Sequence, residues 1–165
     1  AGRGLRTFFE ELMRLGSPRE ARDAARALAS RLPEPLFLAL REQTLLTMQD
    51  SLLKKGEDWP SLMRTTETFL SRDVAQHYGA GTTSTSATLQ PGSFDANGQR
   101  IGLLGHASFL IKTSNQPDTS PSARGLVIRE AMLCQHVPAP PPNVNTELPP
   151  LVPDKPVTMR TRLEL

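Results

Sequence analysis

The three histidines of this 165-residue chain are the side chains best suited to bind a metal ion or a cofactor, and they lie in separate segments. His77 ends an apolar helical pattern, His106 lies in the stretch RIGLLGHASFL, and His136 precedes a run of prolines. They are accompanied by no HExxH, no CxxC and no ladder of carboxylates, so the spacing predicts no metal site. The chain also has no CxxCH attachment sequence for a c-type haem. His106 and His136 are therefore candidates only as axial ligands of a haem carried elsewhere.

The nearest approach to a nucleophile motif is Gly105-His106-Ala107-Ser108, which differs from the GxSxG elbow of serine hydrolases. The phosphate-binding patterns GxGxxG and GxxxxGK[ST] do not occur. We therefore find no catalytic signature within this chain, and whether it belongs to an enzyme stays open. A carbohydrate-binding module is disfavoured by the aromatic content, because the chain has one Trp and one Tyr.

The only cysteine is Cys134, which excludes a disulfide within this chain. Two interpretations stay open. Cys134 is a small buried hydrophobic residue, or it is half of a disulfide to a segment that this sequence does not contain.

The charge balance argues against a nucleic-acid partner. The chain has 19 Lys and Arg residues and 17 Asp and Glu residues, which gives a net charge of +2. Nucleic-acid binding usually needs a clustered basic face. No window of about 18 apolar residues exists, so we expect no membrane span. The chain starts at Ala1 and ends at Leu165 in mid-pattern. We therefore expect its partners to be other protein chains or the missing domains of a longer precursor.

Apolar periodicity predicts a mainly α fold, a small helical bundle followed by a loop-helix unit and an extended proline-rich C-terminal arm. Ser17 and Glu20 form a capping box at the start of one helix. The longest apolar pattern, 36–55, predicts the central core helix. The longer expected helices are 4–15, 18–32, 36–55, 66–78, 101–111 and one that begins at Pro121, and a short helical turn is expected over 61–64.

Composition divides the chain into four regions. These are a helical bundle over 1–79, an exposed loop over 80–99, a helix-turn-helix unit over 100–136 and a proline-rich extended arm over 137–165. Short strands near 87–89 and 93–94 are an alternative for part of the loop.

The polar stretch before Pro121 predicts a structural corner. Thr119 or Ser120 caps the helix that Pro121 opens, and the first turn of that helix directs Arg124 back at the polar loop.

The same corner belongs to a longer pattern, TS-x-x-P-D-x-TSP-x-x-RG, then a helix, Leu-Cys and a proline run ending in Asn-Val. The residues that we assign to a structural or interaction motif are Thr113, Ser114, Thr119, Ser120, Pro121, Arg124, Gly125, Cys134, Pro140, Pro141 and Pro142. The pattern resembles a family of large extracytoplasmic, c-type-cytochrome-linked bacterial proteins of the planctomycete and myxobacterial type, built of domains of unknown function. Similar segments lie upstream, at Thr68–Leu70, Ala75–Gly79 and Arg100–Leu104.

The resemblance implies a setting more than a reaction. It implies a secreted, periplasmic or envelope location and a role in electron transfer as part of a protein complex. In the family, the region similar to 158–165 leads into a CxxCH segment, which this sequence lacks. We therefore expect no cofactor within this chain, with haem c in an adjoining segment or a partner. The expected function is a non-catalytic structural or interaction module, or subunit, of an envelope redox assembly. The alternative is a fragment of a haem-dependent oxidoreductase whose haem-binding segment lies outside this chain.

Overall fold

The computed structural model describes residues 2–28, 30, 32–79, 82–95, 98, 100–115, 118–139 and 141–142. The chain divides into two compact units, 1–112 and 113–165. Helical elements outnumber strands in the described part of the chain, which confirms the prediction of a mainly α protein.

The first unit opens with two short helices, α1 (Gly2–Leu12) and α2 (Pro18–Ala27). The predicted capping box lies between them. The backbone N–H of Ser17 donates to Glu20 Oε2 at 2.7 Å, and the N–H of Glu20 donates to Ser17 Oγ at 3.3 Å. These reciprocal bonds satisfy amides that the first turn of a helix leaves without a partner, so the start of α2 is fixed locally.

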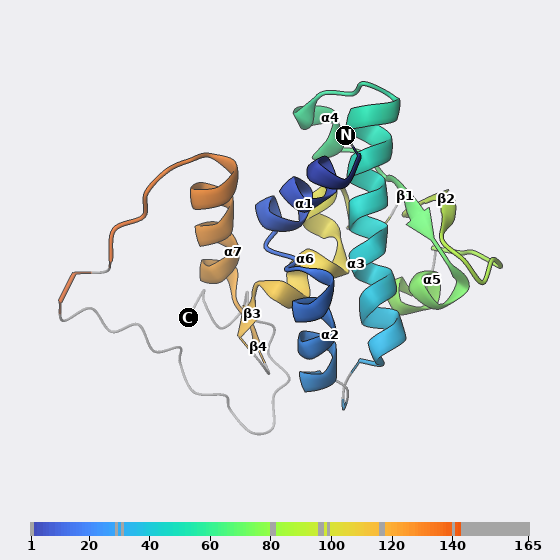
Figure 1. Ribbon diagram of the computed structural model, residues 1–165, viewed down its shortest axis with the longest axis horizontal. Coiled ribbons are helices and arrows are strands. Elements are labelled where there is room, and N and C mark those ends of the chain that lie inside the picture. Colours follow the sequence, from blue (N-terminus) through green and yellow to red (C-terminus); the bar gives the residue numbers. More distant parts are fainter. Residues whose placement is uncertain are drawn as a thin grey trace. The chain divides into compact units, whose positions relative to one another are not determined.

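The central element is α3 (Glu34–Met48), which continues directly into the π-helical turn η1 (Gln49–Lys54). Within the first unit, α1 and α2 lie on one side of α3 (Figure 1). On the other side lie α5 (Arg72–Tyr78) and the pair of strands β1 (Glu67–Leu70) and β2 (Gln90–Ser93). Leu40, Leu45 and Met48 of this helix are completely buried. The prediction of a central core helix over 36–55 is therefore confirmed.

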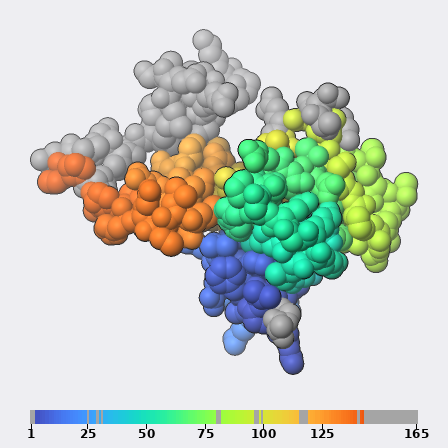
Figure 2. Space-filling view, turned by 90° about the horizontal axis from the view of Figure 1, so that it is seen from above, coloured from blue at the N-terminus to red at the C-terminus, as the bar shows by residue number. Residues whose placement is uncertain are grey.

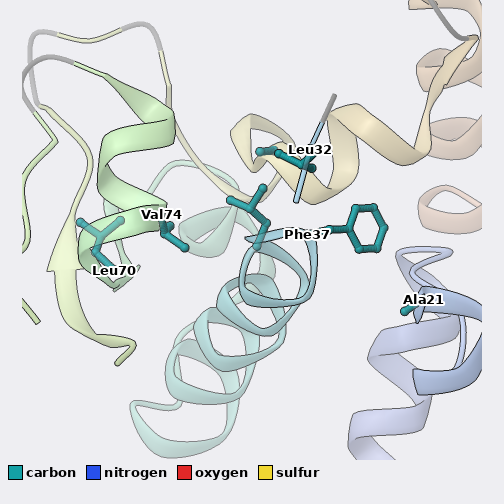
Figure 3. Close-up of a cluster of buried hydrophobic side chains, with 7 residues drawn as sticks. Ala21, Leu32, Phe37, Leu70 and Val74 are labelled. Atoms are coloured by element: carbon teal, nitrogen blue, oxygen red, sulfur yellow. The ribbon is translucent and has the colours of Figure 1, made fainter. Parts of the chain in front are cut away.

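The hydrophobic core around α3 draws on residues far apart in the sequence (Figure 3). Leu70 and Val74 lie on the side of β1 and α5, Ala21 comes from α2, and Phe37 of α3 lies between them. The whole cluster is Ala21, Leu32, Phe37, Leu40, Leu70, Val74 and Ala107.

Charged side chains attach α1 to α3. Arg41 is 5% exposed, and its Nη2 lies 2.6 Å from Glu10 Oε1 and donates to the Gly16 carbonyl at 2.7 Å. Beside this pair, Arg6 binds Glu42, and its hydrogen bonds hold the pKa of that carboxyl below its ordinary value. The contact pairs the two buried charges with each other, although Arg41 Nε is a buried donor without a hydrogen-bond partner.

The apolar pattern of 66–78 predicts one helix, but the structure shows two elements there. The segment contains the strand β1 (Glu67–Leu70) and the helix α5 (Arg72–Tyr78), separated by Ser71, whose Oγ accepts from the Val74 N–H at 3.4 Å. Threonine and phenylalanine favour the extended backbone of a strand, and the Ser71 cap starts the helix afresh. His77 does lie in the last turn of α5, as expected.

The region 80–99 is not simply an exposed loop. Its strand β2 (Gln90–Ser93) pairs antiparallel with β1, and Phe94 is only 3% exposed. The expectation of exposure was wrong for Phe94 because the ring packs edge-on against Tyr78, with 4.9 Å between the ring centroids. The strand near 93–94, given as an alternative, lies close to the observed one.

The helix expected over 101–111 begins later, as the 3-10 turn η2 (Leu103–Gly105) followed by α6 (Ala107–Lys112). Gly102 sets this start, because its φ is +60° and a Cβ there would lie 1.8 Å from the Met63 carbonyl oxygen. Its N–H also donates to the Thr65 carbonyl at 2.8 Å. Only glycine fits this close approach of two backbones.

The second unit contains two paired two-residue strands and one longer helical stretch. Its elements are β3 (Ser114–Asn115), β4 (Asp118–Thr119), α7 (Pro121–Val127) and the π-helical turn η3 (Ile128–Met132). The unit begins at Thr113, so α6 belongs to the first unit and not to the region 100–136. The physical reason is burial, because Phe109 of α6 is 1% exposed in the first unit. Of the expected arm over 137–165, the structure describes 137–139 and 141–142, which are neither helical nor in a strand, and the rest lies outside the described residues.

The remaining helix of the described residues is the short α4 (Trp59–Leu62). Across the residues that the structure describes, no helix combines the length and the apolar character needed to cross a membrane.

Candidate functional site

Polar side chains occupy the middle of the central helix. Gln43, Thr44 and Thr47 of α3 are each 4% exposed or less, although buried positions of a core helix are usually apolar. A buried polar group costs free energy unless it is hydrogen-bonded. Each of these three side chains therefore needs hydrogen-bond partners inside the first unit.

Thr44 joins α3 to the segment that contains the candidate ligand His106. Its Oγ1 lies 2.9 Å from His106 Nδ1 and 2.6 Å from Ser108 Oγ, and it donates to the Leu40 carbonyl at 3.3 Å. The two polar side chains of the Gly105-His106-Ala107-Ser108 stretch thus both pair with Thr44 inside the core.

Gln43 joins α3 to β1 and α5. Its Nε2 donates to Thr68 Oγ1 at 3.1 Å, and its Oε1 accepts from the Tyr78 hydroxyl at 2.7 Å. The same hydroxyl accepts from the Ala107 N–H at 3.1 Å, and Thr47 Oγ1 lies 3.0 Å from Thr68 Oγ1. Hydrogen bonds therefore run from α6 through α5 and α3 to β1. We call the seven side chains Gln43, Thr44, Thr47, Thr68, Tyr78, His106 and Ser108 the buried polar network.

His106 has the properties of a neutral core residue. It is 1% exposed, and burial, with a further contribution from the nearby Arg100 charge, lowers its pKa to about 3. Its ring packs edge-on against Phe94, with 5.4 Å between the centroids, and the Arg100 guanidinium lies 4.8 Å from the centroid of the Tyr78 ring. Its Nδ1 is engaged by Thr44, so the imidazole is held by its neighbours on α3 and in the aromatic stack.

The other candidate ligand, His136, is exposed and belongs to the second unit, so the two histidines do not form one cluster within either unit. Among the described residues, no three His, Cys, Asp or Glu side chains are grouped so as to hold a metal ion.

Cys134 is exposed, and its φ is +51°. The interpretation as a buried small hydrophobic residue is therefore wrong. The reason is its position just after η3 and Leu133, where the chain leaves the helical stretch in a left-handed backbone conformation.

The corner before α7 has the predicted geometry. Ser120 Oγ accepts from the Ala123 N–H at 3.2 Å, and Pro121 occupies the first turn. Arg124 Nη1 donates to Thr119 Oγ1 at 2.9 Å. Ser120 is therefore the cap, and Thr119 holds the arginine that was expected to point back at the loop.

The remaining motif residues are spread along the second unit. Thr113 is 4% exposed, Ser114 lies in β3 and Gly125 in α7. Pro141 and Pro142 are exposed, while Pro140 lies outside the described residues.

A polar pocket of about 470 Å³ lies in the first unit beside the buried polar network. Its walls come from the end of α3, η1, the segment before β1, and the β1–β2 pair, and its lining includes the network residues Thr47 and Thr68. We call it the η1 pocket. In Figure 2 the end of α3 with η1 is drawn in teal and green, next to the yellow-green segment that contains β2.

Comparison with known proteins covers the C-terminal part of the chain. Residues 100–165 match the family PSCyt3, described as a protein of unknown function (DUF1588). The PSCyt3 match contains the corner and the proline run, and its name denotes planctomycete cytochrome-like proteins, consistent with the resemblance seen in the sequence. The upstream part of that resemblance, before Arg100, lies outside the PSCyt3 match. No curated protein and no solved structure matches the chain.

The PSCyt3 match and the polar interior overlap only in part. His106 and Ser108 lie within the matched residues, whereas Gln43, Thr44 and Thr47 lie before them. Sequence reasoning missed these three residues, although a signal exists. Polar residues at positions i, i+1 and i+4 in the middle of a strongly apolar helix indicate a buried hydrogen-bonding face.

Proposed function

We propose that this chain is a non-catalytic structural or interaction module of a cytochrome-linked protein assembly outside the cytoplasm. The PSCyt3 match over 100–165 supports the link to cytochrome-like proteins. The extracytoplasmic setting and the role in electron transfer rest on the resemblance of the motif from Thr113 to Val144.

The observation that carries the proposal is a pair of exposed apolar side chains in the second unit. Leu126 is 37% exposed and Leu133 is 56% exposed, and Val127 is the only hydrophobic side chain buried among the described residues of that unit. Leu126 lies in α7, and Leu133 follows η3 seven residues later. We take these two exposed leucines as part of a surface that contacts another protein. The Ser120 cap and the Arg124–Thr119 bond fix the start of α7, the helix that carries Leu126.

A test places a photo-crosslinking amino acid at Leu133 of the full-length natural protein in its own cells. We expect the adducts to contain a protein or segment with covalently bound haem, identified by mass spectrometry of haem-bearing peptides. The matched control places the same amino acid at Arg22, which is exposed on the polar helix α2.

Haem-bearing adducts at Leu133 and not at Arg22 support the proposal. Adducts at Leu133 that contain no haem-bearing peptide, or equal haem-bearing adducts at both positions, contradict it.

The alternative, a fragment of a haem-dependent oxidoreductase, stays a prediction. It needs a histidine of this chain at the cofactor, and the full burial of His106 does not favour that role. Its test is the absorption spectrum of a longer, haem-containing form of the protein with His136→Ala or His106→Ala. Unchanged absorption spectra in both variants would contradict this alternative function.

A further inference from the structure

A polar segment without charged residues leads from α5 to β2. Residues 79–94 contain no Asp, Glu, Lys or Arg, and residues 82–88 are all Ser or Thr except Ala87. The structure places 82–88 outside helices and strands, and Figure 2 shows the yellow-green part of the chain at the edge of the first unit. Neither the buried polar network nor the exposed leucines of the second unit involve the side chains of 82–88.

Alternate residues attach this segment to the first unit. Thr82 is 8% exposed, and Ser84 Oγ donates to the Leu70 carbonyl at 3.3 Å. The Ser86 carbonyl accepts from the Arg72 N–H at 2.7 Å. The segment is therefore held by the first unit at every second residue from 82 to 86.

The residues between these attachment points face solvent. Thr83 and Thr85 are exposed, and neither hydroxyl has a hydrogen-bond partner within the described part of the chain. Alternation of exposed and less exposed residues is typical of extended backbone, in which residues two apart lie on the same side. The segment thus presents two threonine hydroxyls to solvent on one side of an attached stretch of chain.

Such hydroxyls are suited to accept a transferred group. Their oxygen atoms are nucleophiles once a base removes the proton, and an exposed stretch without helix allows an enzyme to surround them. Segments rich in Ser and Thr are typical carriers of O-linked sugars, as the mucin-like stalks show. We propose that Thr83 and Thr85 are acceptor sites for O-linked glycosylation by a separate transferase.

The transfer needs a sugar that is activated as a phosphate ester, which is the second substrate of the transferase. The threonine Oγ1 forms a bond to the anomeric carbon, and the bond from that carbon to the phosphate oxygen breaks. The phosphate leaves with the electron pair, and the hydroxyl proton goes to a base of the transferase. No oxidation or reduction takes place, so the step does not depend on the proposed link to cytochromes.

Phosphorylation of the same hydroxyls fits less well. Kinases commonly select their substrates by the charges near the acceptor, and the sequence has none over 79–94. The side chain of Arg72, whose backbone binds Ser86, already lies 3.5 Å from the Asp73 carboxylate. The neighbours of the two threonines along the chain are threonine and serine, which leave room for a sugar ring.

The test is mass spectrometry of the full-length natural protein isolated from its own cells, with fragmentation that keeps side-chain modifications in place. We expect mass increments of whole sugar residues on Thr83, on Thr85 or on both. Mild alkali should remove these increments, because it releases O-linked sugars from threonine by β-elimination. The control position is Thr7, which is exposed but lies in α1 and donates to the Arg3 carbonyl, and it should carry no sugar.

Matched variants made in the same cells separate the acceptor from its surroundings. Thr83→Ala combined with Thr85→Ala should abolish the sugar increments on this segment. Thr83→Ser combined with Thr85→Ser keeps both hydroxyls and should retain the increments. Thr7→Ala should leave them unchanged. All three changes are at exposed positions, and circular dichroism checks that each variant is folded.

Four outcomes overturn the proposal. The first is the absence of sugar increments on 82–88 in the protein from its own cells. The second is a phosphate on Thr83 or Thr85 in place of a sugar. The third is equal modification of Thr7, which would show that exposure alone decides. The fourth is retention of the sugar in the double alanine variant. None of these bears on the crosslinking test at Leu133, which concerns the second unit.

Discussion

The buried polar network of the first unit and the corner before α7 in the second unit differ in how far apart in the sequence their partners lie. In the first unit, Thr44 pairs with residues 62 and 64 positions away in the sequence, His106 and Ser108, and all three are buried. In the second unit, Ser120 pairs with a backbone group three residues away and Arg124 with a side chain five residues away. Long-range buried bonds exist only when the whole unit is folded, whereas local bonds form with one turn of helix. Changes in the first unit should therefore affect global stability, and changes in the second unit should act locally.

The largest contrast is expected between two glycines. Gly102→Ala in the first unit should lower the free energy of unfolding by about 4 kcal/mol or prevent folding, because the new methyl group meets the Met63 carbonyl oxygen. The measurement is urea denaturation of the full chain, followed by far-ultraviolet circular dichroism.

The matched control for that change is Gly125→Ala in the second unit, where a Cβ has no heavy atom within 4 Å. Because this glycine lies inside α7, alanine should stabilise the helix by about 0.5–1 kcal/mol. Comparable destabilisation by both variants would contradict the contrast between the units.

A second contrast tests the buried polar network with a pair of identical substitutions. Thr44→Val keeps the shape of the side chain but removes the hydroxyl shared by His106 and Ser108, leaving buried polar groups without that partner. We expect a loss of about 2–3 kcal/mol in the same denaturation measurement.

Thr7→Val is the control for Thr44→Val. Thr7 is exposed on α1, and its hydroxyl donates to the Arg3 carbonyl at 3.2 Å, so we expect a change within about 0.5 kcal/mol. If Thr44→Val costs no more than Thr7→Val, the network contributes little to the stability of the first unit.

The contrast between local and long-range bonds also explains what the sequence could predict. The Ser17–Glu20 capping box, the Ser120 cap and the Arg124 contact depend on neighbours within five residues, and each was predicted correctly. The central helix was predicted too, because its apolar pattern extends over many turns.

The predictions that failed depend on tertiary contacts. The pattern of 66–78 fits a helix, but pairing with β2 makes its first half a strand. Phe94 was placed in an exposed loop, although its ring packs between Tyr78 and His106. Similarly, the η1 pocket joins residues about 20–45 positions apart, so spacing in the sequence gives no sign of it. The sequence around His106 likewise gives no sign that Thr44 and Phe94 contact its ring.

A third prediction concerns how the stability of the protein depends on pH, and it compares histidines of the two units. The pKa of His106 is about 3 in the folded protein and near 6.5 in the unfolded chain, so below pH 6.5 the unfolded state binds a proton that the folded state does not. The contribution of His106 to stability is therefore complete above pH 6.5 and decreases as the pH falls toward 3. Between pH 7 and pH 5 we expect a loss of about 2 kcal/mol. Burial also lowers the pKa of His77, which adds to the loss in the same direction.

Urea denaturation at several pH values checks this, with two variants. His106→Gln should flatten the dependence between pH 7 and pH 5, since Gln does not titrate, whereas His136→Gln in the second unit should retain it. An unchanged slope in His106→Gln would show that His106 is not the group responsible.

The smallest effect is expected in the second unit, and it tests whether that unit is stabilised locally. Ser120→Ala removes the hydroxyl that accepts from the Ala123 N–H, which should cost about 1 kcal/mol of local helix stability. Hydrogen exchange of the Ala123 and Arg124 amides should accelerate about fivefold, while amides of α3 should keep their rates. Ser122→Ala, an exposed change in the same helix, should leave these rates unchanged, because Ser120 alone accepts the capping bond. If Ser120→Ala also accelerated exchange in α3, the corner would be part of the same cooperative structure as the first unit. The opposition between local and long-range stabilisation would then be wrong, since a local cap would control the whole chain.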